Sequence, residues 1–156
     1  MRISLLQTGK TRDRFINEGV EIFNSRMKHY APFSIETVPD LKNTRGLSMK
    51  EVQEKEADGI LKRLKSEDYV ILLDEKGKNY SSIAFAQHLN KLEGRVRNLV
   101  FIIGGPYGFS DRIYQRAGEK ISLSSMTFSH QLVRLLFMEQ MYRAFTILRG
   151  EPYHHE

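Results

Sequence analysis

Two almost continuous apolar runs, at residues 69–73 and 99–103, most constrain what this chain can fold into. Such runs are typical of strands that are covered on both faces, as in a parallel sheet. Each run leads into a loop that contains glycine, at Gly77 in the first case and at Gly104 and Gly105 in the second. Because ligands of open parallel sheets bind beyond the carboxyl ends of the strands, we expect a ligand site there.

Strand-like and helix-like segments alternate along the whole chain. The patterns predict strands at 2–7, 33–38, 69–74, 99–103 and 121–123, and helices at 11–30, 48–65, 81–92, 110–117 and 129–149. Ser48 and Glu51 have the spacing of a capping box, which supports a helix start at that point. This alternation predicts one α/β domain over residues 1–156, with a mainly parallel sheet and helices on both faces.

The predicted last helix, 129–149, is apolar almost all round, and its polar residues do not gather on one face. A helix of this kind is buried on more than one side. In a chain of 156 residues, one side can pack on the protein's own sheet and the other on a second copy. We therefore expect a homodimer through this helix, while a wholly internal helix remains the alternative.

Composition excludes several classes of protein. With no cysteine, disulfides, thiolate nucleophiles and cysteine-ligated zinc are ruled out, which fits a protein of the reducing cytoplasm. No apolar stretch approaches the roughly 18 residues of a membrane span, and the five histidines form no metal-binding pattern, so we expect neither membrane nor metal. The net charge of +5 mildly favours a phosphate-rich partner such as RNA.

The glycine loop at 104–108 reads Gly-Gly-Pro-Tyr-Gly. It is neither a phosphate-binding P-loop, since no Gly-Lys-Ser/Thr follows, nor the dinucleotide fingerprint, whose glycines are spaced differently. A tight turn leaving a strand is the simpler interpretation. The run of small polar residues at 122–128 could close over the same ligand, whereas its serines lack the context of a nucleophile.

Three aromatic or titratable residues in the last part of the chain are candidates for function. His130 lies just inside the start of the predicted last helix, where it could cap the helix or touch a ligand. Tyr153 and His154 end the chain with side chains that serve as platforms for unstacked RNA bases. A frayed terminus is the alternative for this tail.

Four motifs in order resemble one known family. They are Ile-Gly-Gly-Pro-Tyr-Gly-Phe-Ser from 103, Leu-Ser-Ser-Met-Thr-Phe-Ser-His from 123, Glu-Gln-Met-Tyr-Arg-Ala-Phe from 139, and Pro-Tyr-His-His from 152. Together with Thr8-Gly9-Lys10 and Val38-Pro39-Asp40, they resemble the bacterial RlmH type of large-subunit ribosomal RNA methyltransferase, of the SPOUT class. The resemblance covers essentially the whole chain. The family more often has proline where this chain has Ser129.

The resemblance implies a C-terminal trefoil knot, an obligate homodimer, and methylation of N3 of a pseudouridine in 23S rRNA by S-adenosylmethionine. The family's cofactor positions fall on Leu73, Gly105, Leu123, Ser124, Ser125, Met126, Thr127 and Phe128. His130 and His154 are candidates for general base or base-edge contact, and Tyr153 for stacking. Arg134 and Arg143 are candidates for contacts that bind RNA phosphates or order the tail. We expect the tail of one subunit to complete the site of the other.

Two other functions remain open at this point. One is a non-catalytic RNA-binding protein of ribosome assembly, which would bind ribosomal particles without binding the cofactor. The other is an enzyme that uses the glycine loop for the phosphate of a small nucleotide, against which the missing P-loop lysine argues.

Overall fold

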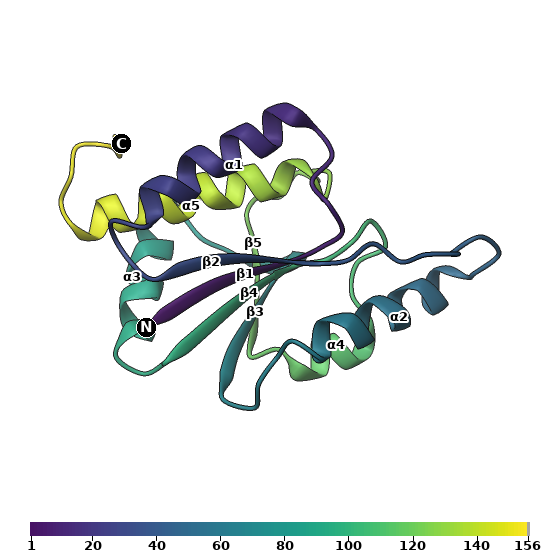
Figure 1. Cartoon of the computed structure of the whole chain (residues 1–156). Helices are drawn as coiled ribbons and strands as arrows, with labels where there is room; N and C mark the ends of the chain where they lie inside the picture. Colours follow the sequence, from purple (N-terminus) through teal and green to yellow (C-terminus); the bar gives the residue numbers. More distant parts are fainter. Residues whose placement is uncertain (156) are drawn as a thin grey trace.

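A computed structural model describes residues 1–155, so that Glu156, the last residue of the predicted domain and tail, lies outside the described part. Five parallel strands form one sheet in the order β2-β1-β4-β3-β5 (Figure 1). The strands are β1 (Arg2–Thr8), β2 (Phe33–Val38), β3 (Asp68–Asn79), β4 (Asn98–Ile103) and β5 (Glu119–Ser122). The helices are α1 (Arg14–Met27), α2 (Met49–Leu61), α3 (Ser82–Glu93), α4 (Asp111–Arg116) and α5 (Leu132–Leu148). The prediction of an α/β domain with a parallel sheet is confirmed.

Helices cover both faces of the sheet, as the alternation of elements predicts. Helices α1, α3 and α5 lie on one face, and α2 and α4 lie on the other (Figure 1). Successive strand residues point to opposite faces, so Leu99, Phe101 and Ile103 of β4 pack under α5 whereas Val100 and Ile102 face α2 and α4. Strands β3 and β4 are therefore buried on both faces of the sheet, which explains the continuous apolar runs in their sequences.

Local signals predict the start of α2 correctly but not the start of α5. At α2 the Ser48 hydroxyl accepts from the Glu51 amide while the Glu51 carboxylate accepts from the Ser48 amide, which confirms the capping box. Helix α5 begins at Leu132, three residues later than predicted, because Ser129 and its neighbours form a turn in which the Ser129 hydroxyl accepts from the Leu132 amide. His130 therefore precedes the helix instead of lying inside it.

Strand β3 is longer than predicted and contains an irregularity. The sequence predicts a strand at 69–74 and then a turn, whereas β3 continues to Asn79 across a register shift after Leu73. Ile121 of β5 pairs in parallel with Leu73 before the shift and with Lys78 after it. Strand β5 thus pairs with both parts of β3. A Cβ at Gly77 would lie 2.5 Å from the Ile121 carbonyl carbon, so only glycine fits where β3 crosses so close to β5.

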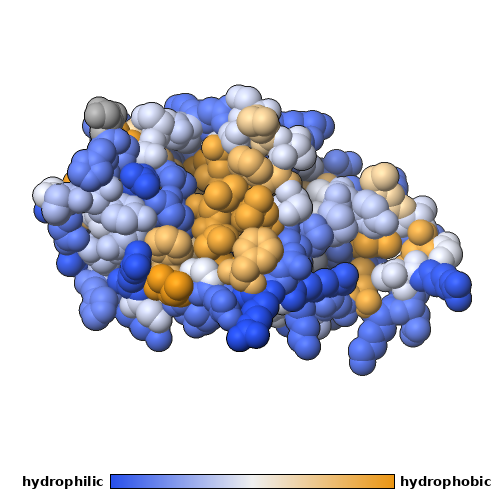
Figure 2. Space-filling model, turned by 90° about the horizontal axis from the view of Figure 1, so that it is seen from above, coloured by the Kyte–Doolittle hydropathy of each residue, from blue (hydrophilic) through white to orange (hydrophobic). Residues whose placement is uncertain are grey.

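Helix α5 packs between α1 and α3 above the sheet, and its most buried side chains are Arg134, Phe137, Met138, Met141, Ala144 and Thr146. Its other apolar side chains are only half-buried, and Leu136 does not pack into the core. Seen from the α1 and α5 side, apolar side chains gather in the middle of the surface, within a polar surround (Figure 2). Helix α5 is therefore not wholly internal in a single chain.

Candidate functional site

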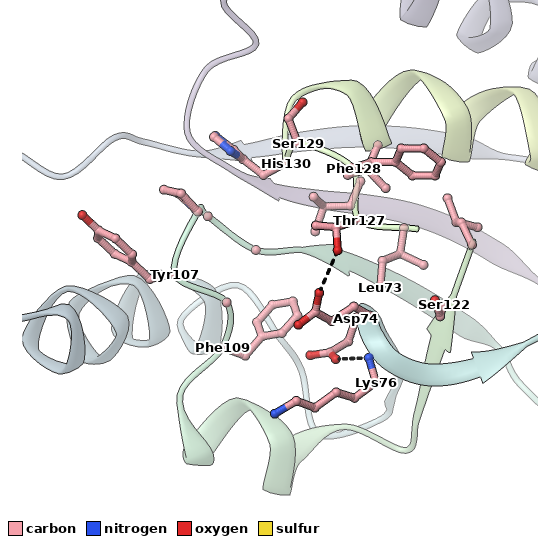
Figure 3. A pocket seen from close by; sticks show the side chains of 18 of the residues that line it. Leu73, Asp74, Lys76, Tyr107, Phe109, Ser122, Thr127, Phe128, Ser129 and His130 are labelled. Carbon is pink, nitrogen blue, oxygen red and sulfur yellow. Dashed lines mark hydrogen bonds between the residues drawn. The ribbon is translucent and has the colours of Figure 1, made fainter. Parts of the chain in front are cut away.

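A cavity of about 590 Å³ opens at the carboxyl ends of β3, β4 and β5 (Figure 3). Its walls come mainly from three segments, namely residues 73–76 at the irregularity of β3, 103–109 at the end of β4 and 121–130 at the end of β5. These loops meet because parallel strands end at the same edge of the sheet. The position of the cavity is the one that the strand-and-glycine pattern predicts.

The structure brings most of the predicted cofactor residues together around this cavity. Leu73, Gly105, Leu123, Ser124, Met126, Thr127 and Phe128 line it. Ser125 belongs to the same loop without being one of the lining residues. Met126 is 75% exposed and Phe128 37% exposed, and both stand at the cavity as apolar surfaces on which a flat ring can pack.

Short local hydrogen bonds shape the loop after β5. The Ser122 hydroxyl donates to the Ser124 carbonyl at 2.7 Å, and the Ser124 hydroxyl accepts from the Met126 amide at 2.9 Å. Small hydroxyl residues make such contacts with their own backbone, which explains why this run is rich in serine. The loop therefore keeps its open form through its own side chains, with the Thr127 hydroxyl 3.4 Å from the Glu75 carboxylate across the cavity (Figure 3).

Acidic side chains form one wall of the cavity, and the sequence analysis did not single them out. Asp74 and Glu75 follow the buried part of β3 directly. The Asp74 carboxylate accepts from the Tyr114 hydroxyl of α4, and burial together with this hydrogen bond raises the pKa of Tyr114. Two carboxylates immediately after an apolar strand were a signal in the sequence. Their charge makes this wall favourable for a cationic ligand.

His130 lies on the side of the cavity opposite the acidic wall (Figure 3). Burial lowers its pKa, and the neighbouring Arg134 and Arg12 guanidinium groups lower it further. The imidazole is therefore neutral at pH 7, with its Nε2 3.3 Å from the Gln131 amide nitrogen. A neutral ring can accept a hydrogen bond from a substrate or donate one to it.

The tail lies at the far end of α5 from this cavity (Figure 1). The Tyr153 hydroxyl donates to the Glu139 carboxylate at 3.0 Å, and the Tyr153 ring packs on Tyr142. Helix α5 has 17 residues, so about 25 Å separates its two ends. Within one chain, the structure does not bring Tyr153 and His154 to His130.

Arg143 orders the tail in this arrangement. Its guanidinium pairs with Glu139 at 2.7 Å, lies 3.2 Å from the His154 Nδ1, and stacks over the Tyr153 ring. These contacts fix both side chains of the tail against α5. Of the two expectations for Arg143, the geometry therefore favours tail ordering over a contact with phosphate.

Comparison with known proteins decides the family. The profile described as "Predicted SPOUT methyltransferase" matches residues 1–154. The chain belongs to this family of methyltransferases. It is similar to the Parabacteroides distasonis protein "Ribosomal RNA large subunit methyltransferase H", at 52% identity over 157 residues that cover all of both chains. A Flavobacterium johnsoniae protein of the same name is 50% identical, again over the full length of both chains.

A SPOUT methyltransferase implies a methyl donor. None of the helices in residues 1–155 is both long and apolar enough to span a membrane. Among these same residues, no three His, Asp or Glu side chains are placed to hold a metal ion together.

Arg134 of this SPOUT protein lies inside the fold of the single chain. Its side chain is 0% exposed, so the guanidinium does not reach the surface in this structure. The guanidinium donates to the carbonyls of Thr8 and Gly9, at 2.6 and 2.9 Å, and to the Thr11 hydroxyl at 2.8 Å. Burial lowers its pKa to about 10, so it stays charged. Arg134 anchors the loop after β1 to α5 and thereby positions the cavity edge beside His130.

We expect Arg134→Met to lower the free energy of unfolding by about 2 kcal/mol, because two carbonyls near α5 lose their donor. Urea denaturation at pH 7 measures the change. Arg95→Met is the matched control, since Arg95 is exposed, and we expect a change within about 0.5 kcal/mol. Equal stability of the two variants would contradict the anchoring role.

Proposed function

We propose that this protein transfers the methyl group of S-adenosylmethionine to N3 of a pseudouridine in 23S rRNA, on assembled ribosomes in the cytoplasm. The observation that carries the proposal is full-length similarity, near 50% identity, to proteins named as large-subunit ribosomal RNA methyltransferases. The strand-end cavity supports it, because its lining agrees with the cofactor positions that the sequence motifs imply.

The residues around the cavity fit S-adenosylmethionine. When bound, this cofactor supplies a sulfonium methyl group that is ready for in-line displacement. Met126 and Phe128 offer apolar surfaces to the adenine, and the Gly105 backbone lets a ligand approach without a Cβ in the way. Asp74 and Glu75 place negative charge beside the cavity, where it attracts the cationic part of the cofactor.

A second copy of the chain completes the site in this proposal. Tyr153 and His154 are held against Glu139 and Arg143 of α5, whereas His130 precedes the start of this helix. Two α5 helices packed antiparallel about a two-fold axis would bring the tail of one chain beside the cavity of the other. The half-buried apolar side chains of α5 supply the surface for such a dimer. His154 and His130 would then both lie close to the target base.

We also propose that the C-terminal region forms the trefoil knot that the family resemblance implies. Support comes from β5, which pairs with both parts of β3 and whose Ile121 backbone lies against Gly77 before the chain continues into α5. This packing holds the residues after β5 against the irregular part of β3, and so keeps both cavity walls together. The rigid walls hold the cofactor in place, and the base can then be positioned about 3–3.5 Å from the methyl carbon.

Transfer of labelled methyl from S-adenosylmethionine to ribosomal particles tests the function. The substrates are 70S ribosomes, separate subunits and free rRNA that lack the modification, and we expect label in 23S rRNA of assembled particles. Ribosomes that already carry the modification are the control and should take up no label. Binding to ribosomes without any transfer of label would instead indicate the non-catalytic assembly protein.

A further inference from the structure

Helix α2 contacts the glycine loop of the cavity at two points. The Gln53 side chain donates to the Tyr107 carbonyl at 2.6 Å. One turn further along, the Glu56 carboxylate lies against Gly105, and a Cβ added to Gly105 would be 2.7 Å from Glu56 Oε1. Gly105 lines the cavity, and the Glu56 carboxylate lies directly behind this glycine without being one of the lining groups itself. Any other residue at this position would push the carboxylate away.

The ionised carboxylate of Glu56 is energetically unfavourable in this position. Its side chain is half-buried, and within residues 1–155 no group donates a hydrogen bond to its carboxylate and no cation pairs with it. Burial, and then the neighbouring Asp40 carboxylate, raise the pKa of Glu56 from its ordinary value of 4.5 to about 7. Desolvation and a like charge both disfavour the ionised form.

The fold does not need this carboxylate. Helix α2 is already held by its capping box, by Gln53, and by the burial of Val52, Ala57 and Ile60. A neutral side chain of the same shape would avoid both the desolvation and the repulsion from Asp40. Groups kept in such unfavourable settings cluster at functional sites.

We infer that Glu56 is the general base that accepts the N3 proton of the target base during methyl transfer. The inference rests on the proposed function. As the bond between N3 and the methyl carbon forms, the bond between carbon and sulfur breaks and its electron pair stays on sulfur. The N3 proton moves to a Glu56 oxygen and later leaves to solvent. A sulfonium cation and a carboxylate anion are thereby both neutralised, which a partly buried site favours.

Glu56 suits this role better than the histidines do. Its pKa close to 7 is near the optimum for a base that works at neutral pH, whereas the pKa of His130 is lowered by burial and by two guanidinium groups. His154 is bound to Arg143 at the far end of α5 in its own chain. The histidines remain candidates for contacts with the edge of the base.

Glu56→Gln tests the assignment in single-turnover methyl transfer with saturating cofactor and ribosomes. We expect the rate to fall about 100-fold or more, since general bases contribute on this scale. The affinity for S-adenosylmethionine, measured by calorimetry, should stay unchanged. Glu54→Gln is the matched control on the same helix; Glu54 pairs with Arg112 away from the cavity, and its loss should leave the rate within about twofold. Glu56→Asp, which keeps the charge and shortens the reach, should lose an intermediate amount.

The pH dependence offers a second readout. The charged group that faces Glu56 is Asp40, which in turn accepts from the Lys10 amide and lies 3.9 Å from Arg12; the glycine loop contributes no charge. The wild-type rate should rise with pH through about 7, and Glu56→Gln should abolish this rise. The wild-type carboxyl binds its proton more tightly when folded, so the stability of the wild type falls as pH increases from 4.5 to 7. Glu56→Gln should therefore melt at a higher temperature than the wild type at pH 8 and at a similar temperature at pH 5.

Three results would overturn the inference. They are a Glu56→Gln rate equal to that of the wild type, a loss of cofactor affinity as large as the loss of rate, and lower stability at both pH values. The second would make Glu56 a ligand of the cofactor's ammonium group, and the third a structural residue. Each of these results is informative only if the wild-type protein transfers label. If the wild type transfers none, the proposed function itself is refuted.

Discussion

Deletion of residues 152–156 is expected to abolish methyl transfer, by about 100-fold or more, while cofactor binding is unchanged. The tail carries Tyr153 and His154, which contact Glu139 and Arg143 of α5 and are not among the residues that line the cavity of their own chain. The cofactor residues belong to the three strand-end loops and do not touch the tail. Single-turnover transfer and calorimetry with S-adenosylmethionine measure the two effects separately.

A mixed dimer decides whether the tail acts on the other chain. The partner is a full-length Gly105→Val chain, whose new side chain would collide with Glu56 at the cavity edge. Neither variant should be active alone. If the tail acts between chains, mixing them restores activity, because the intact cavity of the deletion variant receives the tail of the Gly105→Val chain. A mixture that stays inactive although the two chains form dimers, or a fully active deletion variant, would refute the proposal.

Gly77→Ala is expected to lower the free energy of unfolding by about 3 kcal/mol or more. A Cβ at this position would lie 2.5 Å from the Ile121 carbonyl carbon and 2.6 Å from its nitrogen. These atoms belong to the backbone of β5 where it pairs with β3 on both sides of the register shift, so no side chain can rotate away to make room. Thermal and urea unfolding measure the loss, and the cavity should lose cofactor affinity as its two walls separate.

Gly94→Ala is the matched control. Gly94 ends α3 with a φ of −79°, and no atom lies within 4 Å of an added Cβ. Alanine therefore fits, and by restricting the unfolded chain it should leave stability unchanged or raise it by about 0.5 kcal/mol. If both variants lost stability equally, the crossing at Gly77 would not be the reason.

Sequence patterns predicted the structure best where the burial of residues follows the regular spacing of side chains within one strand or helix. The runs at 69–73 and 99–103 predicted central parallel strands, and Leu72 and Phe101 are indeed buried on the two faces of the sheet. The glycines after the second run predicted the site at the strand ends. These features depend on residues that are close together along the chain. The spacing of apolar residues within one strand or helix is therefore enough to predict them.

The same reasoning failed at the second half of β3. Residues 75–79 carry charges and a glycine, and their composition is that of a turn. They become a strand because β5, more than 40 residues later, supplies the hydrogen-bonding partners at Ile121 and Ser122. Pairing with a distant segment overrides the local preference of the chain.

Sequence patterns also did not predict which groups the individual charged side chains contact. Arg134 and Glu56 both occur on helices, among other charged residues that do lie in solvent. One is buried with its guanidinium on the carbonyls of the loop after β1, and the other faces Gly105 without a partner among the described residues. A helical period tells which face a residue occupies, and not which segment the fold brings opposite to it.

By itself, the sequence determined the order of strands and helices, the parallel sheet, the strand-end location of the site and the motifs of the SPOUT family. Only the three-dimensional arrangement reveals that β5 pairs with both parts of β3, that Arg134 is an internal anchor, and that Glu56 lies against Gly105 of the cavity. The reason is physical. Periodicity and loop chemistry arise from contacts within one element, whereas the crossing and the two charged sites arise from contacts between segments far apart in the chain.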